Sequence, residues 1–377
     1  MNLINTLQNS NFDFFFISVD KFLTINIKEI SNFYLLNSDI LNLNNEIKNS
    51  GKLLSEVITI NFIKNKIKKT GHQAVIVPFK PSGKIEHICQ KENWIYAANP
   101  AKINRFLEDK INFSKLCKKH DLPTIPSIID KFNQENFEKY QQVLNKHLVL
   151  QTRFGWAGKS TFSSSNWEDI KDKIPLQTPV KFTPFLSGYS LINNCCLTNA
   201  GLIQSPPGLQ YTGLSQFTQN PFTTVGRQWP SFAPTKIVEK IKILTEQFAD
   251  VLSNFDYHGF FGLDFFVTDQ EEVFILECNP RLTASFDLYH QIEIRNNINS
   301  LFFFHLLSFL PIETKIDIPQ ENKRFYNSKI IGSEITKKDK SNNTCSRYRD
   351  FIPFSNQNNP INIKPSIIKS ANETVSI

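Results

Sequence analysis

The sequence has little glycine in its first hundred residues, and no glycine-rich turn follows its first apolar segment. The first glycine is Gly51, and only three of the 13 precede residue 100. Dinucleotide-binding folds need such a turn, because the backbone there approaches the pyrophosphate closely. The N-terminal part therefore carries no dinucleotide fingerprint. Nine glycines fall between Gly155 and Gly262, which predicts loops in the middle of the chain that touch a ligand.

Cysteine pairs, long apolar runs and a secretory leader are absent as well. The six cysteines form no CxxC pair and no spacing typical of a zinc site. The first residues, MNLINTLQNSNFDFFF, have neither a basic start nor a small-residue cleavage site, and no uncharged apolar run reaches about 18 residues. We therefore expect a cytoplasmic protein with reduced thiols and no membrane partner.

Concentrated positive charge is also lacking, although the net charge is +7. The basic residues are scattered, and the densest runs are KNKIKK at 64–69 and KKDK at 337–340. A nucleic-acid-binding protein more often has a basic stripe with aromatic residues or a reader helix. A solvated surface is the better interpretation, and we expect no nucleic-acid partner.

The composition is that of a folded protein, with 40% hydrophobic and 20% charged residues over a length that suits two or three domains. Residues 1–103 contain the apolar segments FDFFFIS and QAVIVPF and the helical spacing of NEIKNSGKLLSEVI, which predicts an α/β domain. Helices are expected over 101–120 and 235–255. Beyond residue 320 the chain is polar and irregular, and strand-like pieces broken by prolines follow residue 350.

The middle of the chain predicts strands and loops. KHLVLQTRFGWAGKSTFSS is typical of a strand, a glycine loop and a return strand, so its Gly-Lys-Ser is not a Walker loop. VKFTPFLSGYSLINNCCLTNAGLIQS predicts further strands with turns at 187–188 and 199–201. Residues 204–230 are rich in Gly, Pro, Thr and Gln, and such long irregular stretches are often functional.

The segment GFFGLDFFVTDQEEVFILECNPR predicts a hairpin with a turn over 268–272. Side chains alternate between the two faces of a strand, so Asp264 is expected directly opposite Glu277, with Asn279 one pleat further on the same face. Two acids at such a spacing destabilise a sheet unless a cation or a proton accompanies them. Two carboxylates and an amide oxygen suit Mg²⁺, and the fork of Arg281 suits phosphate or carboxylate. Solvent-facing charges are the alternative.

This hairpin resembles the signature of the ATP-grasp superfamily, whose carboxylate-metal hairpin ends in Glu-x-Asn-Pro-Arg or a close variant. Three segments upstream are similar to the family in the same order. FLEDKINFSKLCKKHDLPTIPS resembles the stretch before the mobile lid, LVLQTRFGWAGKSTF the lid strand and glycine loop, and VKFTPFLSGYSLINNCCLTNAG the strands at the adenine pocket. The resemblance covers about residues 100–295. The tail is similar to the closing β module of ligases related to biotin carboxylase.

The resemblance implies an α/β fold with α+β lobes. A pre-ATP-grasp domain would span 1–103, the ATP-grasp domain 104–318 with its mobile lid over 123–183, and a small β-rich module 319–377. Asp264, Glu277 and Asn279 would hold Mg²⁺ or Mn²⁺, and Arg281 would be the catalytic cation beside the transferred phosphate. The ATP-binding residues would be Lys110, Gln151, Arg153, Gly155, Gly158, Lys159, Thr161, Thr183, Phe185 and Leu186.

Two positions depart from the family. Many members have a lysine where this chain has Gln151, and many have an acid where it has Thr183. Arg153 or Lys159 would then supply the missing charge of the lid, unless both are ordinary surface residues. These departures favour a second hypothesis, a nucleotide-binding protein that has lost turnover.

The leading hypothesis from the resemblance is an ATP-dependent ligase. A small-molecule carboxylate would attack the γ-phosphate of ATP, and an amine would displace phosphate from the acyl phosphate to give an amide, in amino-acid or cofactor biosynthesis. A phosphotransferase at the same ATP site is a third hypothesis. Arg227 and Ser285 are candidate substrate contacts, with a structural salt bridge as the alternative for Arg227. Relatives are often dimers, so a homodimer is compatible with the resemblance. Cys278 and His290 are expected to be structural.

Overall fold

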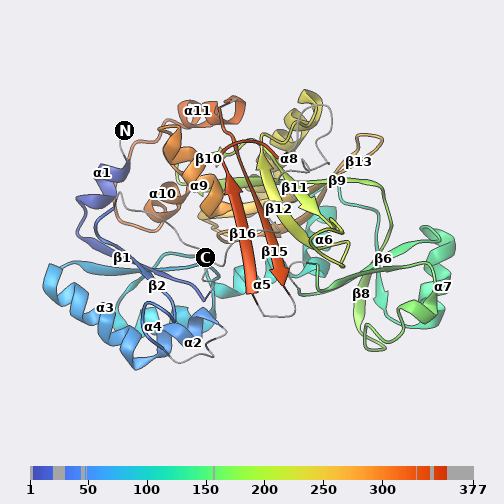
Figure 1. The fold of residues 1–377 in the computed structure, drawn as a ribbon, viewed down its shortest axis with the longest axis horizontal. Helices are drawn as coiled ribbons and strands as arrows, with labels where there is room; N and C mark the ends of the chain where they lie inside the picture. The colour runs from blue at the N-terminus through green and yellow to red at the C-terminus, as the bar shows by residue number, and fades with distance from the viewer. Residues whose placement is uncertain are drawn as a thin grey trace.

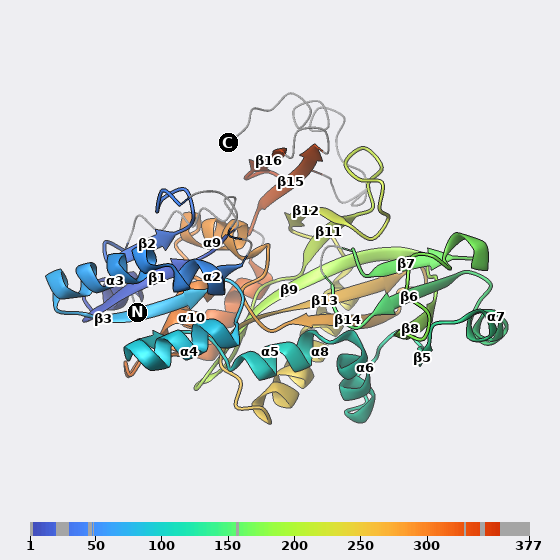
Figure 2. The same cartoon turned by 90° about the horizontal axis from the view of Figure 1, so that it is seen from below.

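The computed structural model describes residues 3–19, 30–43, 47, 49–155, 158–327, 329–339 and 344–354. The molecule is elongated, with a parallel sheet at one end, a small antiparallel sheet at the other and the largest sheet between them (Figures 1 and 2). In the described part of the chain, no helix is long and apolar enough to span a membrane.

The N-terminal unit is an α/β layer, as the sequence predicts. Its sheet is parallel with strand order β2-β1-β3-β4. The strands β1 and β3 are the apolar segments of the sequence, and almost every residue in them is buried because helices cover the sheet. The elements are α1 (Leu3–Gln8), β1 (Phe12–Ile17), β2 (Phe33–Leu36), α2 (Ser50–Ser55), α3 (Val57–Thr70), β3 (Gln73–Pro78), α4 (Gly83–Glu92) and β4 (Ile95–Tyr96).

The helix expected over 101–120 is two helices, α5 (Ala101–Glu108) and α6 (Lys110–Lys119). Asp109 separates them with an extended backbone, and its carboxylate accepts hydrogen bonds from the backbone N–H groups of Ile111 and Asn112. An aspartate at this position caps the new helix and stabilises its N-terminus. The break therefore fixes Lys110 as the first residue of α6.

The small antiparallel sheet has strand order β5-β8-β6-β7. The expected strand, glycine loop and return strand are confirmed as β6 and β7, which pair with Gln151 opposite Thr161. This sheet has a hydrophobic core of its own, to which Phe137 of the adjacent helix contributes. Its elements are β5 (Ile128–Lys131), α7 (Gln134–Val143), β6 (Leu148–Thr152), β7 (Thr161–Ser164), the 3-10 helix η1 (Trp167–Asp169) and β8 (Pro179–Pro184). It occupies the span expected for the lid, and we call it the lid sheet.

The central sheet has the order β14-β13-β9-β11-β12-β15-β16, with β10 paired to β9. The expected turns at 199–201 and 268–272 are present, whereas the turn expected at 187–188 is an irregular link over 185–187 between β8 and β9. Its strands are β9 (Gly188–Thr198), β10 (Gly201–Gln204), β11 (Gly208–Thr212), β12 (Thr224–Trp229), β13 (Gly259–Thr268), β14 (Val273–Asn279), β15 (Gly332–Asp339) and β16 (Thr344–Asp350).

Two expectations about irregular segments need correction. Residues 204–230 are irregular at 205–207, 213–223 and 230, but the rest is the end of β10 and the β11–β12 hairpin, in which Leu209 pairs with Gln228. The polar stretch beyond 320 contains β15 and β16, which extend the central sheet beside β12. Both strands carry charged residues that pair across the sheet, so the sequence shows no apolar alternation there. Strand-like pieces are expected after residue 350, and those beyond residue 354 lie outside the part of the chain that the structure describes.

Helices cover both faces of the central sheet. The long helix α8 (Thr235–Ser253), which the sequence predicts almost to the residue, packs with α5 and α6 on one face (Figure 2). The helices α9 (Phe286–Arg295) and α10 (Leu301–Leu307) pack on the other face near the N-terminal unit. Successive residues of β13 alternate between these two cores, with Phe260 in one and Phe261 in the other.

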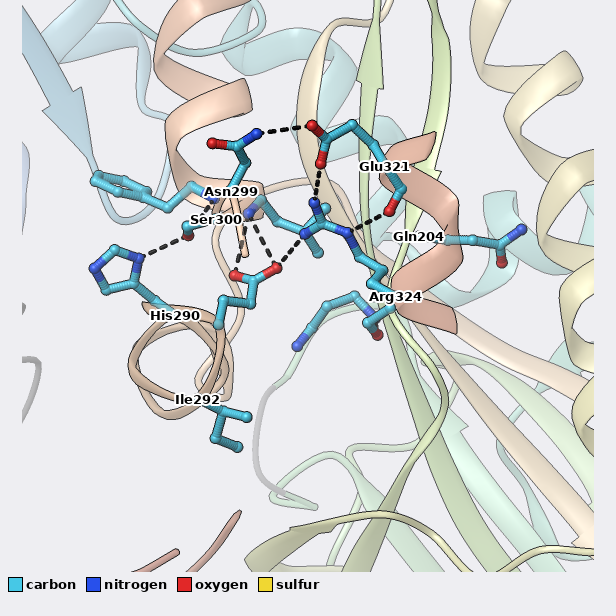
Figure 3. Close-up of polar contacts among 12 residues, drawn as sticks. Gln204, His290, Ile292, Asn299, Ser300, Glu321 and Arg324 are labelled. Carbon is cyan, nitrogen blue, oxygen red and sulfur yellow. Dashed lines mark hydrogen bonds and ion pairs between the residues drawn. The ribbon is translucent and has the colours of Figure 1, made fainter. Parts of the chain in front are cut away.

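A buried group of charges joins α9 to the segment that leads into β15. This segment contains α11 (Ile318–Glu321) and the 3-10 helix η2 (Asn322–Tyr326). The Arg324 guanidinium donates to Glu293 at 2.5 Å and to the Glu321 carboxylate at 2.7 Å, while its Nε donates to the Glu321 carbonyl (Figure 3). The Glu293 carboxylate also accepts from the backbone N–H of Leu301. Glu293, Glu321 and Arg324, called the Arg324 cluster below, pair one guanidinium with two carboxylates and hold these elements together, while burial raises the pKa of Glu293 to about 7.

Candidate active site

A cavity of about 370 Å³ lies between the lid sheet and the central sheet. Strands β6 and β8 of the lid, β9, β11 and β13 of the central sheet and the start of α6 contribute to its walls. Ten of the residues that the resemblance assigns to ATP or metal line it: Lys110, Gln151, Gly155, Gly158, Thr161, Thr183, Phe185, Leu186, Asp264 and Glu277. The structure thus brings together segments that are up to 167 residues apart in the chain.

The pairing of Asp264 with Glu277 is confirmed, but it depends on a bulge. At the turn, Val267 pairs with Val273, and continuing that register would place Leu276 opposite Asp264. One extra residue in β14, at Leu276, shifts the register so that Glu277 takes that position. Such bulges re-aim side chains and are common beside active sites. Both acids consequently face the cavity.

The two acids lie in different electrostatic surroundings. Burial raises the pKa of Asp264 well above its usual range, and the neighbouring Glu277 charge raises it further. Burial acts in the same direction on Glu277, but the Lys110 ammonium at 2.5 Å outweighs it and lowers the pKa of that carboxyl. The raised pKa keeps Asp264 protonated near neutral pH, so Lys110 balances the charge of Glu277, and a cation bound at the pair would displace the proton of Asp264.

A divalent cation fits this pair. Gln210 donates to Asp264 Oδ1 at 3.1 Å, and Asn279 donates to Oδ2 at 3.3 Å, so neutral amides surround the acid. The Asn279 amide oxygen accepts from Arg281 at 3.0 Å. Its carboxamide would have to turn over for this oxygen to face the acids. Within the described residues no group of three or more His, Cys, Asp or Glu side chains could hold a metal, so the two acids would be the only carboxylate ligands.

Arg281 lies at the border with the N-terminal unit rather than on the cavity wall. Its Nε donates to Glu108 at 2.7 Å, and its guanidinium lies over the Phe79 ring. Lys80 binds the second oxygen of Glu108 at 2.6 Å. Phe79 and Lys80 follow the carboxyl end of the parallel strand β3, the position where open α/β sheets bind ligands.

The remaining residues expected at the site lie elsewhere. Arg153 is exposed and its Nε donates to Asp109 at 2.7 Å, and Lys159 is exposed too. Arg227 pairs across the sheet with Glu334, and the two form a buried ion pair at 3.1 Å, which is the salt-bridge alternative for this residue. Ser285 is buried and bonded to Asn194 and Thr283, away from the cavity. Neither Arg227 nor Ser285 lines the cavity.

The two residues expected to be structural are buried. Cys278 lies in the core packed on α8, on the opposite face of β14 from Glu277. His290 is 2% exposed, and its Nδ1 shares a hydrogen bond of 2.7 Å with the Ser300 hydroxyl (Figure 3). Both expectations are confirmed.

The sequence reasoning missed Lys181, Gln210 and Glu108. Lys181 lies on β8 with its side chain toward the cavity, although the residue is only 8% exposed. A signal for it exists in the sequence, because a lysine between Val180 and Phe182 interrupts an apolar strand. Gln210 and Glu108 had no comparable signal, since their roles depend on contacts with Asp264 and Arg281.

The lid loop also contacts the central sheet. Gly158 adopts φ +73, and a Cβ atom there would come within 2.6 Å of the Phe222 backbone. Its carbonyl accepts a hydrogen bond of 3.2 Å from Asn220. The 213–223 loop therefore closes against the glycine loop, which only a residue without a side chain permits at this spacing.

Fold and sequence together define the class of this domain. Residues 107–285 match the ATP-grasp domain family, and the paired carboxylates, the lid sheet and the cavity between them all fall inside that range. These residues therefore form an ATP-grasp domain. No curated protein sequence matches the chain.

Solved structures with the same fold cover most of the chain. The carboxyaminoimidazole ribonucleotide synthase of Aspergillus clavatus, complexed with ATP, has 13% identity and a TM-score of 0.59, over 86% of this chain and 81% of that chain. The N5-carboxyaminoimidazole synthetase of Staphylococcus aureus, complexed with ADP, has 13% identity and a TM-score of 0.58 over the same shares. The biotin carboxylase domain of the Hydrogenobacter thermophilus 2-oxoglutarate carboxylase, with MgADP and bicarbonate, has 11% identity and a TM-score of 0.55, over 86% and 68%. At these identities the likeness establishes the ATP-grasp fold.

Proposed function

We propose that this protein is an ATP-dependent ligase that activates a small-molecule carboxylate as an acyl phosphate and joins it to an amine. The observation that carries the proposal is the cavity between lid and central sheet, where Lys110 and the Asp264–Glu277 pair face one enclosed space. Cations for phosphate and acids for a metal at one site are what phosphoryl transfer from ATP requires. The biosynthesis of an amino acid or a cofactor is the setting we favour.

The cavity lining combines charged and apolar side chains, which suits a nucleotide. Its charged side chains are Lys110, Lys181, Asp264 and Glu277, and the rest of its lining includes the apolar residues Ile125, Val149, Leu186, Phe266 and Ile275. An adenine ring would lie against the apolar residues and the backbone after β8, with the triphosphate directed toward the lysines. The glycine loop of the lid would supply N–H groups to the phosphates.

Asp264 and Glu277 would hold Mg²⁺, with Asn279 joining them once its amide turns over. When bound, the ion neutralises the charge of the phosphates. In the free protein the Lys110 ammonium donates a hydrogen bond of 2.5 Å to Glu277. A cation bound at the two acids would release this lysine to bind phosphate. Arg281, fixed by Glu108, would orient the acid substrate beside the γ-phosphate, at the border with the N-terminal unit.

The reaction balances without an enzyme nucleophile. A carboxylate oxygen of the substrate attacks the γ-phosphorus and ADP leaves, after which the amine attacks the acyl carbon, phosphate leaves and the amine loses a proton. The contact between Gly158 and the 213–223 loop would exclude water from the acyl phosphate, which would otherwise hydrolyse.

Hydroxylamine trapping tests this proposal. The protein is incubated with Mg-ATP, hydroxylamine and pools of amino acids and small carboxylic acids, and ADP and hydroxamates are measured. We expect ADP release together with a hydroxamate in at least one pool. A phosphorylated product without hydroxamate would indicate a phosphotransferase, and no ATP binding at millimolar concentration would refute the enzyme altogether.

A further inference from the structure

We propose that Lys181, on the strand opposite Gln151, is the cation with which the lid of this protein binds the phosphates of ATP. The inference rests on the proposed function, because it assigns a residue within the same ATP site. It removes the main objection to activity, which is the missing lid lysine at position 151.

Lys181 has no anionic partner, although its side chain is almost completely buried. It is 8% exposed and lines the cavity, and no ion pair or hydrogen bond joins it to another described residue. Glu277, the carboxylate that acts on it most strongly, is held by Lys110 instead. Burying an ammonium without a partner is costly, so such a residue is kept where a ligand supplies the anion.

The strand register places Lys181 where a lysine at 151 would be. Strands β6 and β8 are antiparallel neighbours, and Gln151 lies directly opposite Lys181. Side chains of directly opposed residues lie on the same face, with Cβ atoms about 5 Å apart. Both residues line the cavity, as do Val149 and Thr183, the next pair on that face. A cation moved from 151 to 181 therefore still projects into the cavity.

The two basic residues that the sequence analysis offered as substitutes for the lid lysine are less well placed to bind phosphate. The Arg153 side chain is 44% exposed and is held by Asp109 at 2.7 Å. Lys159 is exposed, and neither residue lines the cavity. Lys181 is therefore the lid cation that projects into the cavity among the described residues.

Lys181 and Lys110 together specify the chemistry of the ligand. Burial and, to a smaller extent, the neighbouring Lys110 charge lower the pKa of Lys181 to about 8. Two close ammonium groups repel each other unless an anion with several oxygens lies between them. The phosphates of ATP or ADP meet that description, whereas adenosine does not.

The decisive experiment compares the binding of ATP, ADP and adenosine to the wild-type chain and to Lys181→Gln by calorimetry in Mg²⁺ buffer. We expect ATP and ADP to bind at least about thirtyfold more weakly to the variant, because a buried charge contact is lost. Adenosine affinity should stay within about twofold. Lys131→Gln, the same change at an exposed position of the lid sheet, is the matched control and should change nothing.

A second variant relocates the charge. In the double variant Gln151→Lys/Lys181→Gln the ammonium returns to the opposite strand, and ATP affinity should recover by at least about tenfold relative to Lys181→Gln. No recovery would refute the equivalence of the two positions.

Two outcomes with the single variant overturn the assignment. One is ATP affinity equal to that of the wild type, and the other is an equal loss of ATP and adenosine binding, which indicates a purely structural lysine. If the wild-type chain binds ATP and Lys181→Gln binds it equally well, this inference alone fails. If the wild-type chain binds no ATP, the proposed function fails as well.

Discussion

Two of the buried groups of charges in the described part of the chain differ in whether their partners are inside the protein. In the Arg324 cluster, Glu293 and Arg324 are each 1% exposed at the side chain, and the three guanidinium nitrogens all donate to Glu293 or Glu321 (Figure 3). Among the described residues at the cavity, Lys181 has no anionic partner, and Asp264 receives hydrogen bonds from the neutral amides of Gln210 and Asn279 rather than from a cation.

The comparison shows that buried charge by itself does not mark a functional site. The Arg324 cluster is closed and connects α9 to η2, which is a structural task. The charged side chains at the cavity face its interior, where a ligand and a metal ion can supply counter-ions of both signs. The four predictions below separate these two kinds of site.

Arg324→Met should have the largest effect, a loss of about 3–5 kcal/mol in the free energy of unfolding, because it leaves Glu293 buried without its partner. Urea denaturation of variant and wild type measures it. The double variant Glu293→Gln/Arg324→Met should be less destabilised than the sum of the two single variants, since it removes both charges. ATP affinity in the folded fraction should not change. A stability loss below about 1 kcal/mol would mean that the cluster contributes little.

Glu277→Gln should lower ATP-dependent turnover by about a hundredfold or more. The reason is that the amide removes one of two carboxylates expected to hold Mg²⁺ but keeps the shape of the side chain. ADP release at saturating Mg-ATP gives the measurement. Glu272→Gln, an exposed change on the same hairpin, is the control and should retain full turnover. A fully active Glu277→Gln would remove the metal assignment.

His305, a buried residue of α10, should make the stability of the folded protein sensitive to acid. Its Nδ1 accepts a hydrogen bond of 3.0 Å from the Phe260 backbone, and burial lowers the pKa of the ring to about 3. The unfolded chain titrates near 6.5, so it binds more protons than the folded chain below that pH, and stability is lost as the pH falls. Relative to His305→Gln, the wild type should lose about 1.4 kcal/mol per pH unit between 6.5 and 5. Parallel unfolding curves for the two proteins would contradict this.

Lys181 should give ATP affinity a smaller pH dependence, with the loss at high rather than low pH. Its pKa of about 8 in the free protein reflects burial and Lys110, with Glu277 and Cys117 opposing weakly. Phosphate binding would raise that pKa, so ATP affinity should be nearly constant below about pH 7 and fall as the pH rises through 8, by about fourfold at pH 8.5 relative to the plateau. Lys181→Gln should lack this decline, and an identical decline in both proteins would assign it to another group.

The predicted pairing of Asp264 with Glu277 is present, but not for the assumed reason. The prediction took an unbroken register from a turn centred on Gln270 and Glu271, whereas the observed register at the turn is one residue different and the bulge at Leu276, which left no trace in the sequence, produces the pairing. The two pieces of the helix around Asp109 and the charged strands β15 and β16 were missed, because a single capping residue and cross-strand ion pairs do not alter hydrophobic periodicity.

The other site residues could not be predicted because their positions depend on pairing between strands far apart in the sequence. Lys181 was visible as a lysine in an apolar strand, but its relation to Gln151 requires the β6–β8 register. Likewise, the sequence left Arg227 between a substrate contact and a salt bridge, and the pairing of β12 with β15 places it against Glu334. Contacts between segments a hundred residues apart cannot be read from local patterns.

Calorimetric titration of the wild-type chain with ATP, in Mg²⁺ and in EDTA, tests the central claim most directly. The claim is that the open charges at the cavity are completed by the phosphates of ATP and a divalent cation. We predict saturable binding in Mg²⁺ that weakens by at least about tenfold, or roughly 1.4 kcal/mol, in EDTA. Absence of binding at millimolar ATP, or binding that is indifferent to Mg²⁺, would contradict the account.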